Sequence, residues 1–476
     1  MLSEDVLFST VVELGRGLRA RNFTSVALTE ACLERLNRIG PKLNAVVTIT
    51  AELALGQARQ ADKEMAAGRV RGALHGVPYG AKDLLATRGI KTTWGSRAYQ
   101  NQIPAEDATV IRRLRESGAV LVAKLAMVEL AGGAGYRYAS ASLTGAGLNP
   151  WNTGRWAGGS SSGSGAAVAA GLVPFAIGSE TWGSIVTPAG FCGVSGLRPT
   201  YGRVSRYGAM ALSWTMDKLG PLARSAEDCG LVLEAISGQD PADPTSLRKP
   251  FAFPRRPSAA SSRTPRRSNS PVRRIGFIRE DFPKFGEPEV ERAYEQALDT
   301  LRAAGMTVEE AKLPDFPYEA TAQTIVSAEA SAAFDDLIRS GRTEEIIDPE
   351  GKIGLYAARL VTAADYLKGM RIRTEMRREL AKLFERFEVL VAPSLLIVAP
   401  PIEANLNDVF KGGGEIEAAG NLAGWPALSV PCGFGRDHLP VGLQIVGKPF
   451  DEAALLAVGQ TFQTRTSWHR ERPPVK

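Results

Sequence analysis

Three short segments place serine and lysine residues where nucleophilic chemistry is favoured. Lys82 follows Gly-Val-Pro-Tyr-Gly-Ala, Ser160 follows a Gly-Gly pair, and Ser184 follows Thr-Trp-Gly. A serine hydroxyl becomes a good nucleophile when an adjacent base removes its proton. A lysine can be that base if burial or its neighbours lower its pKa enough for the neutral amine to persist. Because small and apolar residues surround Lys82, we predict a serine nucleophile with a lysine base.

Histidine offers the other common base. The chain has only three histidines: His75 precedes the first of these segments, His438 lies in a polar turn, and His469 is close to the last residue. None of them forms a convincing partner for a serine in the sequence. A Ser-His-Asp triad stays an alternative at this point, because the members of a triad meet in space and not in sequence.

The glycines around these serines also predict a special backbone. Amides that hold an oxyanion need to be free of secondary-structure partners, and the run Thr181, Trp182, Gly183 and Ser184 is the candidate for them. Gly158 and Gly159 allow an uncommon conformation before Ser160. A linker would not continue directly into an Ala- and Val-rich helix, and a phosphate-binding loop would need a lysine after its glycines.

The three segments resemble the amidase signature family. Ser160 and Ser184 are 24 residues apart, which is the family's own spacing, and the lysine segment lies upstream as it does in the family. The similarity continues through the segments 196–208, 216–221 and 439–449. It covers about residues 5–250 and 385–465 and is weak between them.

This resemblance implies a function for each matching residue. Lys82 would be the neutral base, Ser160 the bridging serine after a cis peptide bond, and Ser184 the nucleophile that forms an acyl-enzyme. The amides of Thr181, Trp182, Gly183 and Ser184 would form the oxyanion hole. The expected reaction is the cleavage of a carboxamide C–N bond in a small-molecule amide, and no metal or organic cofactor is implied.

The chain also departs from the family's pattern. The family's Asp-Thr-Gly-Gly-Ser-Ile-Arg is replaced here by Glu180-Thr-Trp-Gly-Ser-Ile-Val186, so the Asp's usual Arg partner is missing. Trp182 replaces a glycine in the oxyanion loop, and the acyl pocket is one direction in which its side chain can point. These changes leave the three catalytic positions intact but put the usual substrate preference in doubt.

An alternative function follows from one branch of this family, the A subunit of the tRNA-dependent amidotransferase, which hydrolyses glutamine. The Pro-Thr-Tyr-Gly-Arg-Val-Ser-Arg-Tyr-Gly stretch is similar to that subunit. However, the Arg-rich segment expected before Gly354 is short, and glycines 412–414 stand where an acid is expected. Misaligned candidates for that acid are Asp408, Glu415 and Glu417. We therefore expect a stand-alone amidase acting on a less polar substrate.

The hydrophobic pattern predicts an α/β fold: a mixed, largely parallel twisted central sheet covered by helices on both faces. We expect an N-terminal helical region (1–70), a signature core (71–250) and a flexible insertion (251–274). A C-terminal part of the same α/β domain (275–476) would contain a variable pocket region (280–420). Within it, a single helix is expected over residues 353–387.

Charge and composition restrict the partners. Residues 253–274 hold seven arginines and no acid, and removing these seven from 57 basic residues leaves 50 against 51 acidic residues. The rest of the chain is therefore near neutral, which argues against a nucleic-acid partner. We interpret the Arg-rich segment as a solvated loop, with an RNA, membrane or protein contact as its alternative, which would make the chain a binding protein and not an enzyme.

The expected compartment is the cytoplasm. The four cysteines form no framework and are expected to be buried free thiols, which persist in a reducing compartment. Neither a secretory signal nor a membrane-spanning stretch is expected. The sequence leaves the oligomeric state open, although homodimers are frequent in the family.

Overall fold

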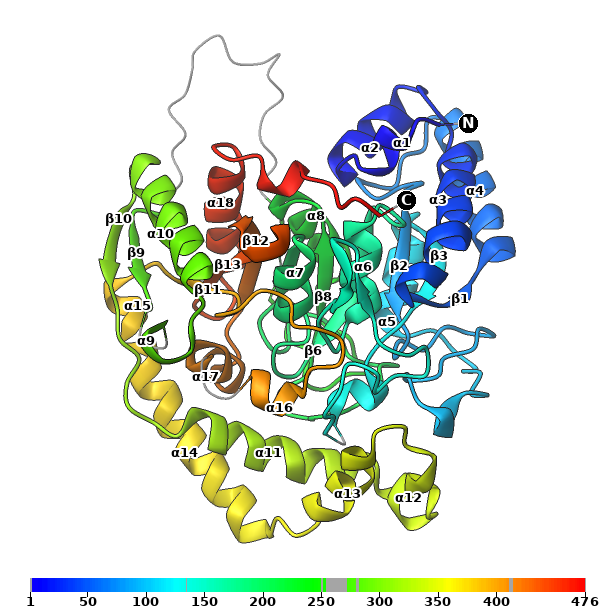
Figure 1. The fold of residues 1–476 in the computed structure, drawn as a ribbon. Coiled ribbons are helices and arrows are strands. Elements are labelled where there is room, and N and C mark those ends of the chain that lie inside the picture. Colours follow the sequence, from blue (N-terminus) through cyan, green and yellow to red (C-terminus); the bar gives the residue numbers. More distant parts are fainter. Residues whose placement is uncertain are drawn as a thin grey trace.

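The computed structural model describes residues 2–133, 135–249, 251–253, 272–279, 282–410 and 414–475. Eleven strands of this described chain form one sheet, in the order β1-β3-β2-β6-β8-β7-β12-β13-β11-β9-β10 (Figure 1). Their bounds are β1 (Val46–Ile49), β2 (Pro78–Lys82), β3 (Val120–Leu125), β6 (Phe175–Glu180), β7 (Ser195–Arg198), β8 (Lys218–Ala223), β9 (Arg274–Phe277), β10 (Thr307–Glu310), β11 (Val389–Pro393), β12 (Ala427–Phe434) and β13 (Pro440–Gly447). A separate pair joins β4 (Leu148–Asn149) and β5 (Asn152–Trp156).

The sheet is mixed, as the sequence predicted. Parallel pairings join β3, β2 and β6 on one side, and β11, β9 and β10 on the other. Antiparallel pairings join the strands between these two groups and add β1 at the edge. Segments from both halves of the sequence therefore share one hydrogen-bonded sheet.

Helices cover both faces of the sheet. Their bounds are α1 (Glu4–Leu7), α2 (Val11–Arg19), α3 (Ser25–Ile39), α4 (Ala51–Ala66), α5 (Thr109–Glu116), α6 (Ser162–Ala169), α7 (Val186–Cys192), α8 (Ala226–Ile236), α9 (Phe282–Phe285), α10 (Pro288–Ala303), α11 (Tyr318–Ala333), α12 (Asp335–Arg339), α13 (Pro349–Ala358), α14 (Ala363–Ala381), α15 (Leu383–Arg386), α16 (Leu406–Val409), α17 (Glu415–Ala423) and α18 (Glu452–Gln463). Adjacent residues of β7 show the two layers. Gly196 faces Ala189 of α7, while the Ser195 hydroxyl accepts a hydrogen bond from Gln463 of α18. The predicted covering of both faces is confirmed.

The N-terminal region contains one strand that the sequence analysis did not predict. Helices α1 to α4 are present, but Val46–Ile49 forms the edge strand β1, antiparallel to β3. All four residues of this run, Val-Val-Thr-Ile, are β-branched, which favours an extended backbone. The break at Gly40-Pro41 and the start of α4 at Ala51 limit this strand to a short segment.

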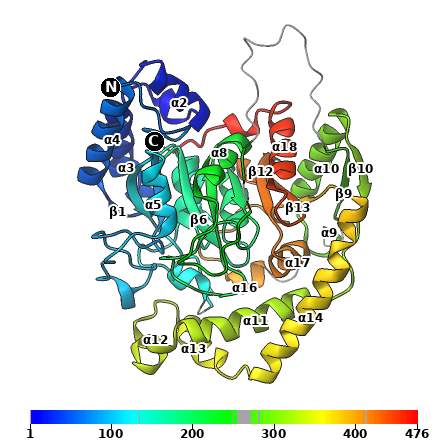
Figure 2. The same ribbon diagram turned by 180° about the vertical axis from the view of Figure 1, so that it is seen from behind.

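The predicted single helix over residues 353–387 is wrong. The chain instead forms α13, α14 and α15, with breaks after Ala358 and Ala381. The hydroxyl of Thr362 accepts a hydrogen bond from the Asp365 amide, and the Asp365 carboxylate accepts one from the Thr362 amide. This capping box starts a new helix and explains the break. Helices α11 to α14 extend along the lower edge of the molecule, as Figure 2 also shows from behind.

Two further expectations concern the cysteines and the insertion. The four cysteines are buried and free, as predicted. The expected flexible insertion falls mostly on residues 254–271, which lie outside the described residues. Within the described chain, no helix combines the length and apolar character that crossing a membrane requires.

Candidate active site

Lys82 is the last residue of β2, which lies between the parallel strands β3 and β6. Its side chain is fully buried. The Lys82 Nζ lies 2.7 Å from the Ser160 Oγ and 2.9 Å from the Oγ atoms of both Ser161 and Ser179. A buried amine is thus surrounded by three hydroxyl groups.

This environment destabilises the charged form of the Lys82 amine. Burial lowers the pKa of Lys82 to about 7, although the carboxylates of Asp217 and Glu180 oppose the shift. The dominant cause is desolvation, which disfavours a cation. A substantial neutral fraction therefore exists at neutral pH, and the neutral amine can accept a proton from a hydroxyl.

Asp83 lies next to Lys82 in sequence but forms its ion pair with a different lysine. Side chains alternate along a strand, so Lys82 and Asp83 face opposite sides of the sheet. The Asp83 carboxylate pairs with Lys124 of β3 at 3.2 Å and accepts hydrogen bonds from the amide and hydroxyl of Thr93. The register between β2 and β3 shifts between Tyr79 and Gly80, just before this position. Asp83 is therefore a structural ion partner of Lys124.

Ser160 follows a cis peptide bond between Gly159 and Ser160, as the resemblance implied. The preceding Gly158 has a φ of +83°, and a Cβ atom there would lie 2.9 Å from the Cα of Pro188. Only glycine fits such a left-handed and crowded position without strain. The Ser160 carbonyl accepts a hydrogen bond from the Val128 amide, which fixes the loop just before α6.

Ser184 lies in the loop between β6 and α7. Its backbone carbonyl accepts a hydrogen bond from the Ser161 amide at 3.3 Å, which holds this loop against the segment that contains Ser160. Within the described chain, the Ser184 hydroxyl has no hydrogen bond to the Ser160 hydroxyl. The structure therefore brings Lys82 and Ser160 into direct contact and places Ser184 on the adjoining loop.

The amides of this loop differ in what they bind. The Glu180 carboxylate accepts hydrogen bonds from the amides of Ile185 and Val186, at 2.8 and 3.0 Å. The amides of residues 182–184 have no acceptor among the described residues. Gly183 has a φ of +82°, where a side chain would also collide with the Glu417 carboxyl. These features agree with a loop that exposes backbone donors.

Glu180 is the centre of a buried ionic network. Its carboxylate pairs with Arg198 at 2.7 Å and accepts a hydrogen bond from the side-chain amide of Asn421. Lys218 donates to the Asn421 side-chain oxygen at 2.6 Å and to the Thr181 carbonyl at 3.4 Å. Burial alone would raise the pKa of Glu180, but Arg198 and Lys218 hold it well below its ordinary value. Arg198 and Lys218 thus supply the positive charge beside Glu180.

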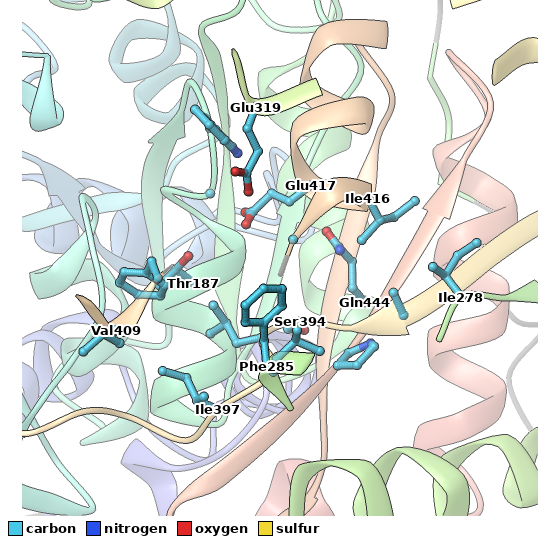
Figure 3. Close-up of a pocket in the computed structure, with 18 of the residues that line it drawn as sticks. Thr187, Ile278, Phe285, Glu319, Ser394, Ile397, Val409, Ile416, Glu417 and Gln444 are labelled. Atoms are coloured by element: carbon cyan, nitrogen blue, oxygen red, sulfur yellow. The ribbon is translucent and has the colours of Figure 1, made fainter. Parts of the chain in front are cut away.

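A cavity of about 210 Å³ opens beside this loop. Gly159 and Gly183, the chain neighbours of Ser160 and Ser184, form part of its wall. Its polar side chains include Glu417 and Gln444, which extend into a space that Ile397, Val409 and Ile416 also border (Figure 3). Aromatic residues dominate the remaining wall: Tyr136, Trp156, Trp182, Phe282, Phe285 and Phe410. Trp182 therefore points into the pocket, which was the direction left open by the sequence.

The histidine alternative finds no support in this geometry. None of the three histidines, all of which are described, lines the cavity. His75 is buried against Glu64, with its Nε2 3.3 Å from a carboxylate oxygen, at a different surface. Burial lowers the pKa of His469 to about 4, and this residue lies in η7 (Trp468–Arg470) near the C-terminal end.

Comparison with known proteins gives the family. The sequence profile of the family described as Amidase matches residues 27–456. The chain belongs to the amidase family. This amidase is 40% identical over 494 residues to the A subunit of the glutamyl-tRNA(Gln) amidotransferase of Chloroflexus aggregans, and the match covers 98% of each chain. The amidase signature predicted from the sequence is thereby confirmed.

Solved structures support the same assignment for this amidase. It superimposes on the native peptide amidase of Stenotrophomonas maltophilia with a TM-score of 0.81 and 32% identity, covering 98% of both chains. The A subunit of the glutamyl-tRNA(Gln) amidotransferase of Thermotoga maritima gives a TM-score of 0.80 with 28% identity, and both chains are covered completely. The chain is thus an amide-hydrolysing enzyme with the fold of amidase signature proteins.

Sequence reasoning missed several residues of this amidase that surround the site. Ser161 and Ser179 both contact Lys82, yet only Ser160 was singled out from the Gly-Gly-Ser-Ser-Ser run. Lys218 and Arg198 were also missed as partners of the oxyanion loop. The single signal for them in the sequence is the loss of the usual arginine at Val186, which leaves Glu180 in need of another cation.

Proposed function

We propose that this chain is an amidohydrolase that cleaves a carboxamide through an acyl-enzyme on Ser184. The observation that carries the proposal is the buried Lys82 amine, 2.7 Å from the Ser160 hydroxyl and with a pKa lowered to about 7 by burial. A lysine that is partly neutral at pH 7 and touches a serine hydroxyl is suited to accept a proton from it.

The proposed reaction moves one proton along three side chains. Ser184 Oγ attacks the amide carbon and passes its proton to Ser160, which passes its own proton to Lys82. The negative oxygen of the tetrahedral intermediate is held by amides of residues 181–184. Collapse breaks the C–N bond, and the proton returns through Ser160 to the leaving amine. Water then attacks the acyl ester by the same relay and releases the carboxylic acid and Ser184.

A labelling experiment tests these roles. A fluorophosphonate probe should modify wild type at Ser184, and an amide panel should identify hydrolysed substrates. Ser184→Ala should abolish both labelling and turnover, while Lys82→Ala should lower kcat by about 10²–10⁴-fold, the usual contribution of a general base. Absence of any turnover together with absence of a Ser184 adduct would overturn the proposal.

A second function is favoured by the 40% identity to the A subunit of an amidotransferase over 98% of both chains. In that case the chain would hydrolyse glutamine and deliver ammonia within a complex with other subunits. A glutamine site needs charged partners for both an ammonium and a carboxylate. The guanidinium of Arg279, which lines the cavity, is already paired with Glu295. We therefore rank the stand-alone amidase first.

The two functions are separated by substrate and by assembly. A stand-alone amidase should hydrolyse simple amides as an isolated protein and should leave glutamine unchanged. Glutaminase activity that appears when the chain co-purifies with further amidotransferase components, and glutamine-dependent amidation of charged tRNA, would instead establish the second function.

A further inference from the structure

The cavity beside the oxyanion loop contains buried polar atoms without a protein partner. Gln444 is 1% exposed, and neither its Oε1 nor its Nε2 atom has a hydrogen-bond partner in the described chain. The indole Nε1 of Trp156 and the Oε1 of Glu417 are in the same state, and all three residues line this one cavity. Buried polar groups are normally hydrogen-bonded, so a cluster of unpaired ones indicates a ligand site.

Gln444 is held in this position by the centre of the sheet. It is paired with Ser429 of β12 on one side and with Ala392 of β11 on the other. Leu443 and Ile445, its neighbours in β13, are fully buried in the main apolar core on the opposite face. The backbone of Gln444 is therefore fixed, and its carboxamide presents one donor group and one acceptor into the cavity.

Glu417 completes the polar side of the cavity close to the reaction centre. Its Oε1 would lie only 2.7 Å from a Cβ atom at Gly183, so the carboxyl is packed against the oxyanion loop. Burial and the nearby negative charge of Glu180 raise the pKa of Glu417 well above its ordinary range. A protonated carboxyl donates one hydrogen bond and accepts others, as a carboxamide does.

The remaining wall of the cavity and the cavity volume limit the polarity and size of the rest of the ligand. Six aromatic side chains and several aliphatic ones form most of the wall, and Phe285 and Phe410 are exposed where the cavity meets solvent. The wall is completed by Thr187, Arg279, Glu319 and Ser394. An apolar cavity of about 150 Å³ is large enough to hold benzene. A cavity of about 210 Å³ therefore accommodates one aromatic ring with a small substituent.

We propose that the substrate is an aryl amide whose ring carries an uncharged hydrogen-bonding group, and that Gln444 and Glu417 are the residues that recognise this group. This inference rests on the proposed function, because it takes the cavity as the acyl pocket. Polar groups that are unpaired in the pocket favour a ligand that pairs with them over an isostere that cannot.

The test compares two pairs of amides of matched shape. In the first pair, 4-hydroxybenzamide differs from 4-methylbenzamide by a hydroxyl in place of a methyl group. In the second, nicotinamide differs from benzamide by one ring nitrogen. For wild type we expect kcat/KM to be at least about tenfold higher for the polar member of at least one pair, because only that member satisfies the buried carboxamide of Gln444.

Substitutions of Gln444 and Glu417 test whether these two residues cause the preference for the polar amide. Gln444→Met keeps the length of the side chain but removes its donor and acceptor, so the preference should fall to about one. Glu417→Gln keeps a neutral donor and acceptor, so the preference should persist, whereas Glu417→Leu should reduce it. Labelling of Ser184 by a fluorophosphonate probe shows for each variant that the fold and the nucleophile are intact.

The outcomes separate this inference from the proposed function. If wild type hydrolyses amides but prefers the apolar member of both pairs, or hydrolyses none of the four, the inference is overturned while the amidase function stands. This measurement needs no variant. Equal losses for both members of a pair in a labelled Gln444→Met protein would also overturn it. Failure of wild type both to be labelled and to hydrolyse any amide would instead remove the proposed function itself.

Discussion

Lys82 is surrounded by hydroxyl groups and not by a carboxylate, and these neighbours decide its protonation. A hydroxyl hydrogen-bonds to an ammonium without neutralising the cost of burying it, so the amine loses its proton near pH 7. Lys124, on the opposite side of the sheet, is equally buried but has Asp83 as a partner. Burial lowers the pKa of Lys124 as well, but there the adjacent Asp83 opposes the shift.

The protonation of Lys82 predicts the pH dependence of the reaction. Below pH 7 the amine is mostly protonated and cannot accept a proton, while above pH 7 it is mostly neutral. The kcat/KM for an uncharged amide should therefore rise about tenfold per pH unit at low pH and level off above the pKa of about 7. A profile that stays flat between pH 6 and 10 would contradict the lysine-base role.

The Asp83–Lys124 pair predicts a stability effect that is independent of catalysis. Asp83→Asn removes the anion and leaves Lys124 buried without a counter-charge, which typically costs about 3–5 kcal/mol. The double variant Asp83→Asn with Lys124→Met removes both charges and should recover much of this loss. Thermal unfolding of the two proteins provides the measurement, and an Asp83→Asn protein as stable as wild type would show that the pair contributes little.

At the level of elements, β6 and α7 hold the oxyanion loop between them, and Glu180 joins the two. Its carboxylate accepts hydrogen bonds from the first amides of α7 and pairs with Arg198 at the end of β7. The Glu180 carboxylate thus accepts hydrogen bonds from the amides of Ile185 and Val186. The amides of residues 182–184 have no acceptor among the described residues. The Glu180 carboxylate therefore fixes the loop together with the Ser161 amide, which donates to the Ser184 carbonyl.

Glu180→Gln should impair the loop more than the binding pocket. We expect kcat to fall by about 10–100-fold with a smaller change in KM, because a displaced donor weakens the transition state more than the substrate complex. The thermal midpoint should also fall, since Arg198 and Lys218 lose their counter-charge. Glu52→Gln, at an exposed position in the first turn of α4, is the matched control and should change neither quantity. An unchanged kcat in Glu180→Gln would contradict this role.

Structural features could be predicted best from the sequence where residues close together in the chain determine them. Lys82 and Ser160 were found because their segments, and the 24-residue spacing of Ser160 and Ser184, resemble the amidase signature family. The break before α14 could have been predicted from Thr362-Ala-Ala-Asp365, which is a capping-box pattern. In contrast, Gln444 lies within an apolar run that is typical of a core strand, and only the assembled sheet reveals that its side chain enters a cavity.

At the level of the whole molecule, one sheet joins strands from both ends of the chain, and the described residues that flank positions 254–271 lie close to one another. Phe253 and Val272, which flank residues 254–271, are both buried and line the same cavity. The ends of the segment are therefore close together in the folded protein. None of the residues that line this cavity also lines the cavity beside Gly159 and Gly183.

Replacing residues 254–271 by a short Gly-Ser linker should therefore preserve catalysis. We expect kcat and KM within about twofold of wild type and a similar thermal midpoint, because closing a surface loop costs little free energy at any moderate length. Amide turnover by the shortened protein is the measurement. Loss of activity in a correctly folded protein would favour the alternative in which this basic segment contacts a partner that the function requires.

The alternation of side chains along β2 has a consequence for how this enzyme can change during evolution. Deleting one residue before Lys82 without a compensating bulge would turn the strand over at that point. The amine would then enter the space beside Lys124, and the carboxylate of Asp83 would meet the serine hydroxyls. The phase of five residues, Pro78 to Lys82, thus decides which of two adjacent ionisable groups faces the serine hydroxyls.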